Sequence, residues 1–163
     1  MPIIRFRDGY KRQLTRDVFI ASTISLPNGV DKVEMSWFSI IRASVGSLLH
    51  FKKGYAYDGA SGPTIDTKTV IRGPLCHDGW YQAIREGHAG YTSKQRDMYR
   101  RLADMELRRM IKEDVRHIHA KWYRVPLRWW GLFRAEYWYL GVRLGAGYAA
   151  NPANRRKEKV YTV

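Results

Sequence analysis

The sequence predicts an α+β fold: a small N-terminal antiparallel β-sheet, then an antiparallel helix pair, then a C-terminal amphipathic helix with an extended tail. Residues 1–57 contain short apolar runs divided by turn signals, which is typical of antiparallel strands. Residues 73–121 contain apolar side chains at helical spacing on both sides of a short loop, and such loops join antiparallel helices. The chain has 163 residues, of which 45% are hydrophobic and 27% charged, so it can bury a substantial core.

The strands are expected in the first 57 residues. Polar residues separate Val33, Met35 and Trp37, and this alternation favours a half-buried strand. Turns are expected at Asp8-Gly9 and at Pro27-Asn28-Gly29, because these residues favour turn conformations. The expected strands run from Pro2 to Phe6, from Leu14 to Ile24, from Val33 to Trp37 and from Leu48 to Tyr57.

Two helices are expected next. Gly73-Pro74 marks the start of the first, because a proline at the first helical position loses no useful N–H, and Gly87 marks its end. Thr92-Ser93-Lys94-Gln95 fits a capping box, in which the threonine oxygen accepts from a backbone amide while the glutamine reaches back. The second helix then continues to about Lys121 without glycine or proline, so we expect it to be the longest.

A third helix is expected from Leu127 to Leu144, after Pro126 interrupts the pattern. Its large apolar side chains share one broad arc: Trp129, Phe133, Tyr137, Leu140 and Leu144. The stretch from Trp122 to Trp138, rich in Trp and Tyr with interleaved arginines, has three interpretations: a helix lying in a membrane interface, a docking face for another protein, or packing on the protein's own core. We expect one domain over residues 1–144, with a β-rich part (1–57), a motif loop and helix pair (58–121) and the aromatic helix (122–144), followed by a basic arm (145–163).

Positive charge is the strongest signal of the composition. Lys and Arg number 29 against 15 Asp and Glu, a net charge of +14, and the excess is concentrated in residues 122–163. Such a surface attracts polyanions, so nucleic acid, an anionic membrane surface and acidic proteins are candidate partners. The lone cysteine, Cys76, excludes a disulfide framework and a zinc site built mainly from thiolates. We expect no signal peptide and no transmembrane segment, because charged residues interrupt the apolar runs.

The residues that can carry chemistry lie in the segment His77-Asp78-Gly79-Trp80-Tyr81. On a helix, His77 and Tyr81 share a face, whereas Asp78 lies about a hundred degrees round. The imidazole can then act as a base on one side while Asp78 binds a cation on the other. A second carboxylate is needed to orient the imidazole, and Asp104 lies at a similar depth on the antiparallel helix. The candidate catalytic residues are therefore His77, Asp104 and Tyr81.

The loop before the first helix offers oxygen ligands for a cation. Residues 57–62 are rich in glycine, and their carbonyl groups suit Ca²⁺, which takes about six to eight oxygens. The candidate calcium ligands are Tyr57, Gly59, Ser61 and Asp78. A structural interpretation stays open, because a buried His–Asp–Tyr cluster satisfies its own hydrogen bonds. Asp104 would otherwise pair with an arginine such as Arg72 or Arg85.

Three motifs in this order resemble a family of short phage and prophage proteins of unknown function, over about residues 48–112. The matching segments are Asp58-Gly59-Ala60-Ser61, His77-Asp78-Gly79-Trp80-Tyr81 and Arg100-Arg101-Leu102-Ala103-Asp104. More distantly, the order is similar to the phospholipase A₂ pattern, especially its bacterial and fungal branch, although the disulfides typical of that family are absent. This second resemblance implies that His77 activates water, that Asp78 binds Ca²⁺, and that Tyr81 and Asp104 support the histidine.

Two main functions follow from these patterns, beside a plain nucleic-acid binder, which the charge favours although the sequence has no recognisable binding motif. The first is a phospholipase A₂-like hydrolase that uses a cation to cleave lipid or other esters during lysis or as a phage enters its host. The second is a non-catalytic virion or tail protein that uses the same motif as a scaffold, with the basic arm binding DNA or neighbouring subunits. The expected location is the virion or the host cytoplasm. An enzyme requires His77 to face a cleft, whereas a scaffold would seal it and satisfy both ring nitrogens.

Overall fold

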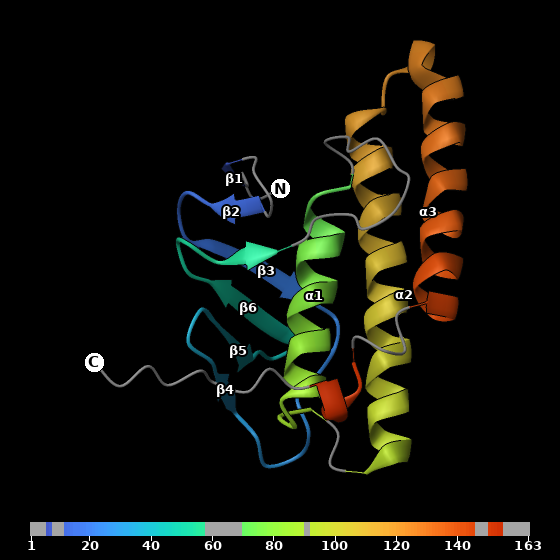
Figure 1. Ribbon diagram of the computed structural model, residues 1–163. Helices are drawn as coiled ribbons and strands as arrows, with labels where there is room; N and C mark the ends of the chain where they lie inside the picture. Colours follow the sequence, from blue (N-terminus) through green and yellow to red (C-terminus); the bar gives the residue numbers. More distant parts are fainter. Residues whose placement is uncertain (1–5, 8–11, 58–69, 90–91, 146–149, 155–163) are drawn as a thin grey trace.

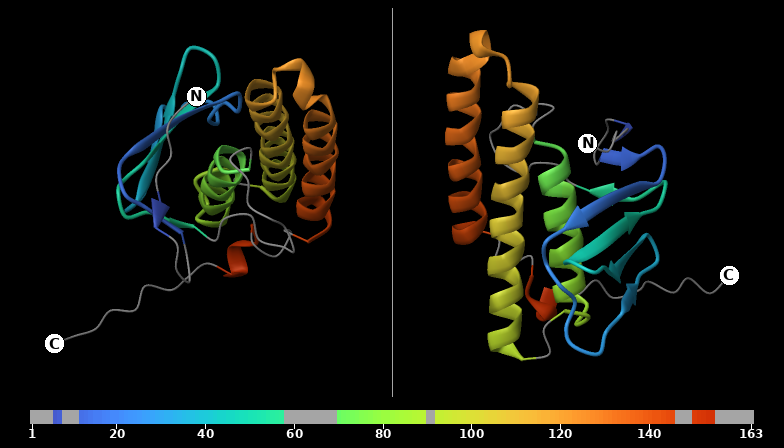
Figure 2. Two further views of the ribbon diagram at one scale, coloured as in Figure 1. Left: turned by 90° about the horizontal axis from the view of Figure 1, so that it is seen from above. Right: turned by 180° about the vertical axis from the view of Figure 1, so that it is seen from behind.

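The computed structural model describes residues 6–7, 12–57, 70–89, 92–145 and 150–154. The predicted α+β class is confirmed, since antiparallel strands come first and three α-helices follow in the described part of the chain. The elements form layers: α1 (Arg72–Arg85) lies against the sheet, α2 (Ser93–Ile118) against α1, and α3 (Val125–Gly145) on the far side of α2 (Figures 1 and 2).

The strands form two antiparallel sheets, with the orders β3-β6-β5-β4 and β1-β2-β7. The larger sheet consists of β3 (Val18–Ser22), β4 (Lys32–Glu34), β5 (Phe38–Arg42) and β6 (Ser47–Phe51). The smaller consists of β1 (Phe6–Arg7), β2 (Arg12–Leu14) and β7 (Ala56–Tyr57). Buried and exposed residues alternate along β3, which gives the larger sheet one face for the core and one for solvent.

The strands differ from the sequence prediction at four places, of which the largest is β5, a strand that the sequence analysis did not predict. The stretch from Leu48 to Tyr57 forms two strands, because the chain turns at Gly54, whose φ of +93° is accessible to glycine without strain. The stretch from Leu14 to Ile24 is likewise divided between β2 and β3. The strand that begins near Val33 ends at Glu34, and Trp37 lies beyond it with 54% of its surface exposed. The expected strand residues 2–5 and the turn at 8–9 lie outside the described residues.

Helix α1 is held directly against the sheet by a glycine. A Cβ placed on Gly79 would lie 2.8 Å from Cζ of Phe51 and 3.2 Å from Cδ2 of Leu49, so only glycine allows this approach. The helix begins at Arg72, at the predicted Gly73-Pro74 signal. It ends before Gly87, whose φ of +82° confirms the predicted stop.

The predicted capping box starts α2, and it is complete. The backbone N–H of Gln95 donates to Oγ1 of Thr92 at 3.2 Å, and the backbone N–H of Thr92 donates to Oε1 of Gln95 at 3.0 Å. Helix α2 spans 26 residues to Ile118 and is the longest helix described. One face of it packs on α1 and another on α3, so it links the sheet side of the molecule to the outer helix.

Helix α3 packs on α2 through two small residues and a tryptophan, and it leaves its aromatic arc exposed. Its buried residues are Gly131, Ala135 and Trp138, and a Cβ on Gly131 would lie 2.7 Å from Cγ2 of Val115. The aromatic arc points away from α2, so the core interpretation is wrong for the side chains of the arc, whereas within the stretch 122–138 it is confirmed for Trp138, which is buried against α2. A short 3₁₀ turn (η1, Trp122–Arg124) connects α2 to α3.

The core has two parts. The larger lies between the sheet and α1, where the side chains of Phe38, Phe51 and Trp80 are fully buried. The smaller joins α2 to α3 around Ile111 and Val115. Within the predicted basic arm, Ala150 is buried and a 3₁₀ turn (η2, Pro152–Asn154) contacts α1, while residues 155–163 lie outside the described part.

Candidate functional site

The candidate site is centred on the carboxylate of Asp104, in the middle of α2. This side chain is completely buried. On one of its oxygens, Oδ1, two groups of α1 converge: Nε2 of His77 at 3.0 Å and the hydroxyl of Tyr81 at 2.7 Å. The predicted contact between His77 and Asp104 is thus confirmed, and Tyr81 joins it as the shared helix face implied.

Helix geometry accounts for this convergence. His77 and Tyr81 are one turn apart on α1, and their rings lie 4.0 Å apart between centroids, so both face α2 together. A carboxylate can only accept hydrogen bonds here, so Nε2 of His77 carries a proton and donates it to Asp104. The remaining ring nitrogen, Nδ1, is then the one that can accept a proton in the neutral imidazole.

Asp78 lies close to that second nitrogen. Its Oδ1 is 3.4 Å from Nδ1 of His77, a long contact, and 33% of the Asp78 side chain is exposed. Sequence spacing predicted that Asp78 points to a different target. In the structure it turns back toward its neighbour, so His77 lies between the carboxylates of Asp78 and Asp104.

The pKa values of the three central groups reflect this arrangement. Burial has the largest effect on His77 and lowers its pKa, but hydrogen bonds with Asp104 and Asp78 outweigh burial, so the pKa is raised overall. Burial raises the pKa of Asp104, yet hydrogen bonds from His77, Tyr81 and Arg143 lower it below its ordinary value. Burial, followed by the charge of Asp104, raises the pKa of Tyr81. The carboxylate is therefore ionised and the phenol neutral near pH 7.

Arg143 is the member of this site that sequence reasoning missed. It reaches back from the end of α3, and its Nη1 donates to Oδ2 of Asp104 at 3.0 Å. The alternatives Arg72 and Arg85 pair elsewhere: Arg72 with Asp114 at 2.7 Å, and Arg85 with Glu86 at 3.7 Å. The position of Arg143 off the aromatic arc was a usable signal, because an antiparallel third helix brings that part of its surface back along α2.

The predicted calcium ligands are described only in part. Tyr57 lies in β7 and is buried, and Asp78 lies on α1, while Gly59 and Ser61 lie outside the described residues. In the part of the chain that the structure describes, no group of three His, Cys, Asp or Glu side chains could hold a metal ion. The calcium site stays a prediction that depends on the loop at 57–62.

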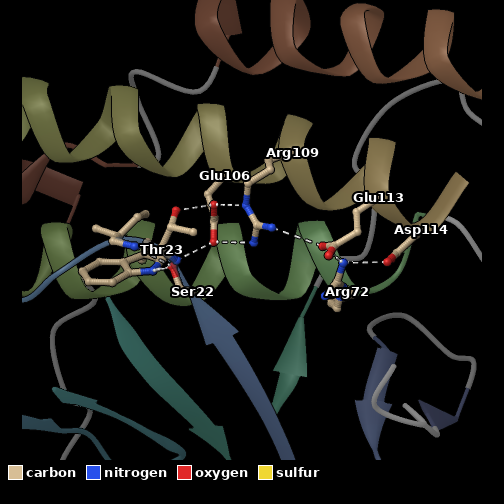
Figure 3. A network of polar contacts seen from close by, with 9 residues as sticks. Ser22, Thr23, Arg72, Glu106, Arg109, Glu113 and Asp114 are labelled. Carbon is tan, nitrogen blue, oxygen red and sulfur yellow. Dashed lines mark hydrogen bonds and ion pairs between the residues drawn. The ribbon is translucent and has the colours of Figure 1, made fainter. Parts of the chain in front are cut away.

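A second polar network, which sequence reasoning also missed, runs along α2 (Figure 3). Glu106 accepts from the backbone N–H and the hydroxyl of Thr23, both at 2.8 Å, and from Nε of Arg109 at 2.7 Å. Arg109 also contacts Glu113, which accepts from Arg72 at 2.6 Å. The spacing of three and four residues along α2 was the available signal. This network ties the end of β3 and the start of α1 to α2.

The same network borders a groove of about 900 Å³ between residues 23–28 and α2. Glu106, Arg109, Met98 and Met105 are among its lining residues. Neither His77 nor Asp78 lines the groove, so it is separate from the candidate site. The carboxylate of Glu106, which does line it, already accepts hydrogen bonds from Thr23 and Arg109.

Comparisons with protein-family models, with curated proteins and with solved structures give no match. The phage and phospholipase resemblances therefore depend on the three sequence motifs. No described helix is long and apolar enough to cross a membrane.

Proposed function

We propose that the chain is a phage-type, phospholipase A₂-like hydrolase that cleaves lipid or other esters, with His77 as the base. The observation that carries the proposal is the convergence of His77 Nε2 and Tyr81 on one oxygen of the buried Asp104. This contact places the Nε2 proton toward Asp104, so that once Asp78 turns away, Nδ1 of the neutral imidazole is the proton acceptor that acid–base catalysis requires.

The chemistry assigns one role to each group. Nδ1 of His77 takes a proton from water as the water oxygen attacks the ester carbonyl, and the same proton then goes to the departing alcohol as the ester C–O bond breaks. Asp104 stabilises the imidazolium that forms between these steps, and the hydroxyl of Tyr81 donates a hydrogen bond that keeps the Asp104 carboxylate in position. Asp78 must turn away from Nδ1 before water can take its place. A Ca²⁺ ion held by Asp78 and the carbonyl groups near 57–61 would polarise the ester carbonyl.

A second candidate function has its own observation. His77 is only 6% exposed, and each of its ring nitrogens lies near a carboxylate. A sealed and satisfied histidine favours the scaffold function, in which the chain is a non-catalytic virion or tail protein and its basic C-terminal region contacts DNA or neighbouring subunits.

One experiment separates the two. Fatty-acid release from vesicles of anionic phospholipid is measured for the wild type, His77→Gln and the control His88→Gln, with Ca²⁺ or with chelator, and thermal stability is recorded for each. The hydrolase proposal expects release to fall about a hundredfold or more in His77→Gln at similar stability, and to be unchanged in His88→Gln, whose side chain is exposed.

Three outcomes would contradict the hydrolase proposal or part of it. If the wild type releases no fatty acid with or without Ca²⁺, and also leaves soluble ester substrates intact, the hydrolase proposal fails. A large loss of stability in His77→Gln would then support the scaffold function. Activity that survives chelation would retain His77 as the base but remove the calcium site.

A further inference from the structure

The most conspicuous unexplained feature of the molecule is the outer face of α3. We give this name to Leu127, Trp129, Trp130, Phe133, Tyr137, Leu140 and Leu144, each of which is at least 50% exposed. Trp130 and Phe133 stack with their ring centroids 5.9 Å apart. Spacings of three and four residues place these side chains on one side of the helix, so they form one continuous apolar surface. Contiguous apolar surfaces of this kind mark interaction sites.

Folding does not need this surface. Helix α3 is attached to α2 by its opposite side, through Gly131, Ala135 and Trp138. That side is already packed, so the outer face is a second apolar face on the same helix.

The charges around the outer face select an anionic partner. The one acidic residue of α3, Glu136, is turned toward α2, where it pairs with Arg108 at 2.7 Å and Lys112 at 2.5 Å. The outer face itself contains no carboxylate, and the charged residue that lies within its arc is Arg134. At its N-terminal end lie Lys121 and Arg124, both near the ring of Tyr123.

We propose that the outer face of α3 is a docking surface for an anionic lipid bilayer, with the helix lying in the plane of the headgroup region. Trp and Tyr side chains favour that region because they combine an apolar ring with a polar group, and the basic residues attract anionic headgroups. Because the inner side of α3 is packed along α2, the outer face can meet a bilayer only with the helix axis parallel to the membrane surface.

The charge of the chain favours an anionic bilayer over a second copy of the chain as the partner of the outer face. Pairing two outer faces would bring together two molecules that each carry a net charge of +14, and would place Arg134 of each near a surface without carboxylates. An anionic bilayer meets the same surface with opposite charge. The proposal does not depend on the hydrolase function, because a non-catalytic virion protein could dock on a membrane in the same way.

The test compares two double variants that remove the same residue types. Trp130→Ser with Phe133→Ser changes the outer face. The control, called the sheet variant, carries Trp37→Ser with Phe19→Ser and removes two aromatic side chains that are exposed by 54% and 53%, one between β4 and β5 and one on β3. Binding to vesicles of phosphatidylglycerol mixed with phosphatidylcholine, and of phosphatidylcholine alone, is measured by sedimentation. Circular dichroism confirms that each variant is folded.

We expect the wild type to bind the anionic vesicles, the outer-face variant to bind about tenfold or more weakly, and the sheet variant to bind like the wild type. Quenching of tryptophan fluorescence by brominated lipid should fall in the outer-face variant alone. Failure to bind anionic vesicles, or an equal loss in both variants, would overturn the proposal. A dimer in sedimentation equilibrium that only the outer-face variant dissociates would assign the face to a second copy instead.

Discussion

Arg143, near the end of α3, donates to the Oδ2 oxygen of Asp104, in the middle of α2, across 3.0 Å. The other oxygen of the same carboxylate accepts from His77 and Tyr81 of α1. One buried carboxylate therefore connects all three helices, and its charge is balanced from two opposite sides.

Removing this connection should cost stability. Arg143→Ala takes away a charged donor from a buried carboxylate, and we expect the free energy of unfolding to fall by about 1–2 kcal/mol. The loss is moderate because 32% of the Arg143 side chain is exposed to water. Urea denaturation measures it, with Arg101→Ala on the exposed side of α2 as the control of equal charge. Equal stability of the two variants would show that the ion pair contributes nothing.

The contact of α1 with the sheet gives a second prediction. Gly79→Ala should destabilise the protein by about 1–3 kcal/mol, because the added methyl group meets the ring of Phe51, which is fully buried and cannot move aside. Gly141→Ala is the matched control: it lies in α3 with open space around it and should gain up to about 1 kcal/mol from helix propensity. Thermal denaturation of both variants checks the signs, and a stabilised Gly79→Ala would contradict the packing argument.

The Glu106 network predicts a pH dependence. Burial raises the pKa of Glu106, but hydrogen bonds from Arg109 and Thr23 lower it below its ordinary value. A lowered pKa in the folded state stabilises the protein above the ordinary Glu range near pH 4.3, and this stabilisation is lost as the pH falls through the folded-state pKa. Glu106→Gln should thus cost about 1–3 kcal/mol at pH 7 and progressively less below about pH 4.

Urea denaturation between pH 3 and pH 7 measures that difference. Asp97→Asn serves as the control, because its exposed surface ion pair with Arg100 contributes little at any pH. A penalty in Glu106→Gln that stays constant over the whole range would show that the carboxylate charge does not stabilise the folded protein.

Cys76 should be chemically inert in the folded protein. It is 1% exposed, and burial raises the pKa of its thiol, so little thiolate is present at neutral pH. Labelling by a thiol reagent at pH 8 should be slower by about a hundredfold or more than in urea-unfolded protein, whose single thiol gives the reference rate. Rapid labelling of the native protein would mean that α1 opens readily at this point.

The sequence allowed correct predictions where local rules decide the structure. The capping box at Thr92 and Gln95 is complete within four residues, and the pairing of His77 with Asp104 follows from helix geometry and a short loop. The strand boundaries were less accurate. The turn at Gly54, which follows Lys52 and Lys53, was missed because a lone glycine in a sequence does not reveal a positive φ.

Two features of the candidate site depend on information that spacing does not contain. The position of Arg143 is set by how α3 is aligned along α2, which in turn depends on close packing of Gly131 against Val115. The contact of Asp78 with His77 depends on the side-chain rotamer of Asp78, whereas helix geometry only fixes where its Cβ points. In both cases tertiary packing decides.

The two faces of α3 are under different requirements. On the inner face, Gly131 has no room for a Cβ because Val115 occupies that space, so a library of random variants sorted for folding alone should retain small residues there. The same library should accept serine, lysine or glutamate at Trp130 and Phe133, because solvent surrounds them. Sorting the library a second time for biological activity would then reveal, position by position, what the aromatic side chains contribute apart from the fold.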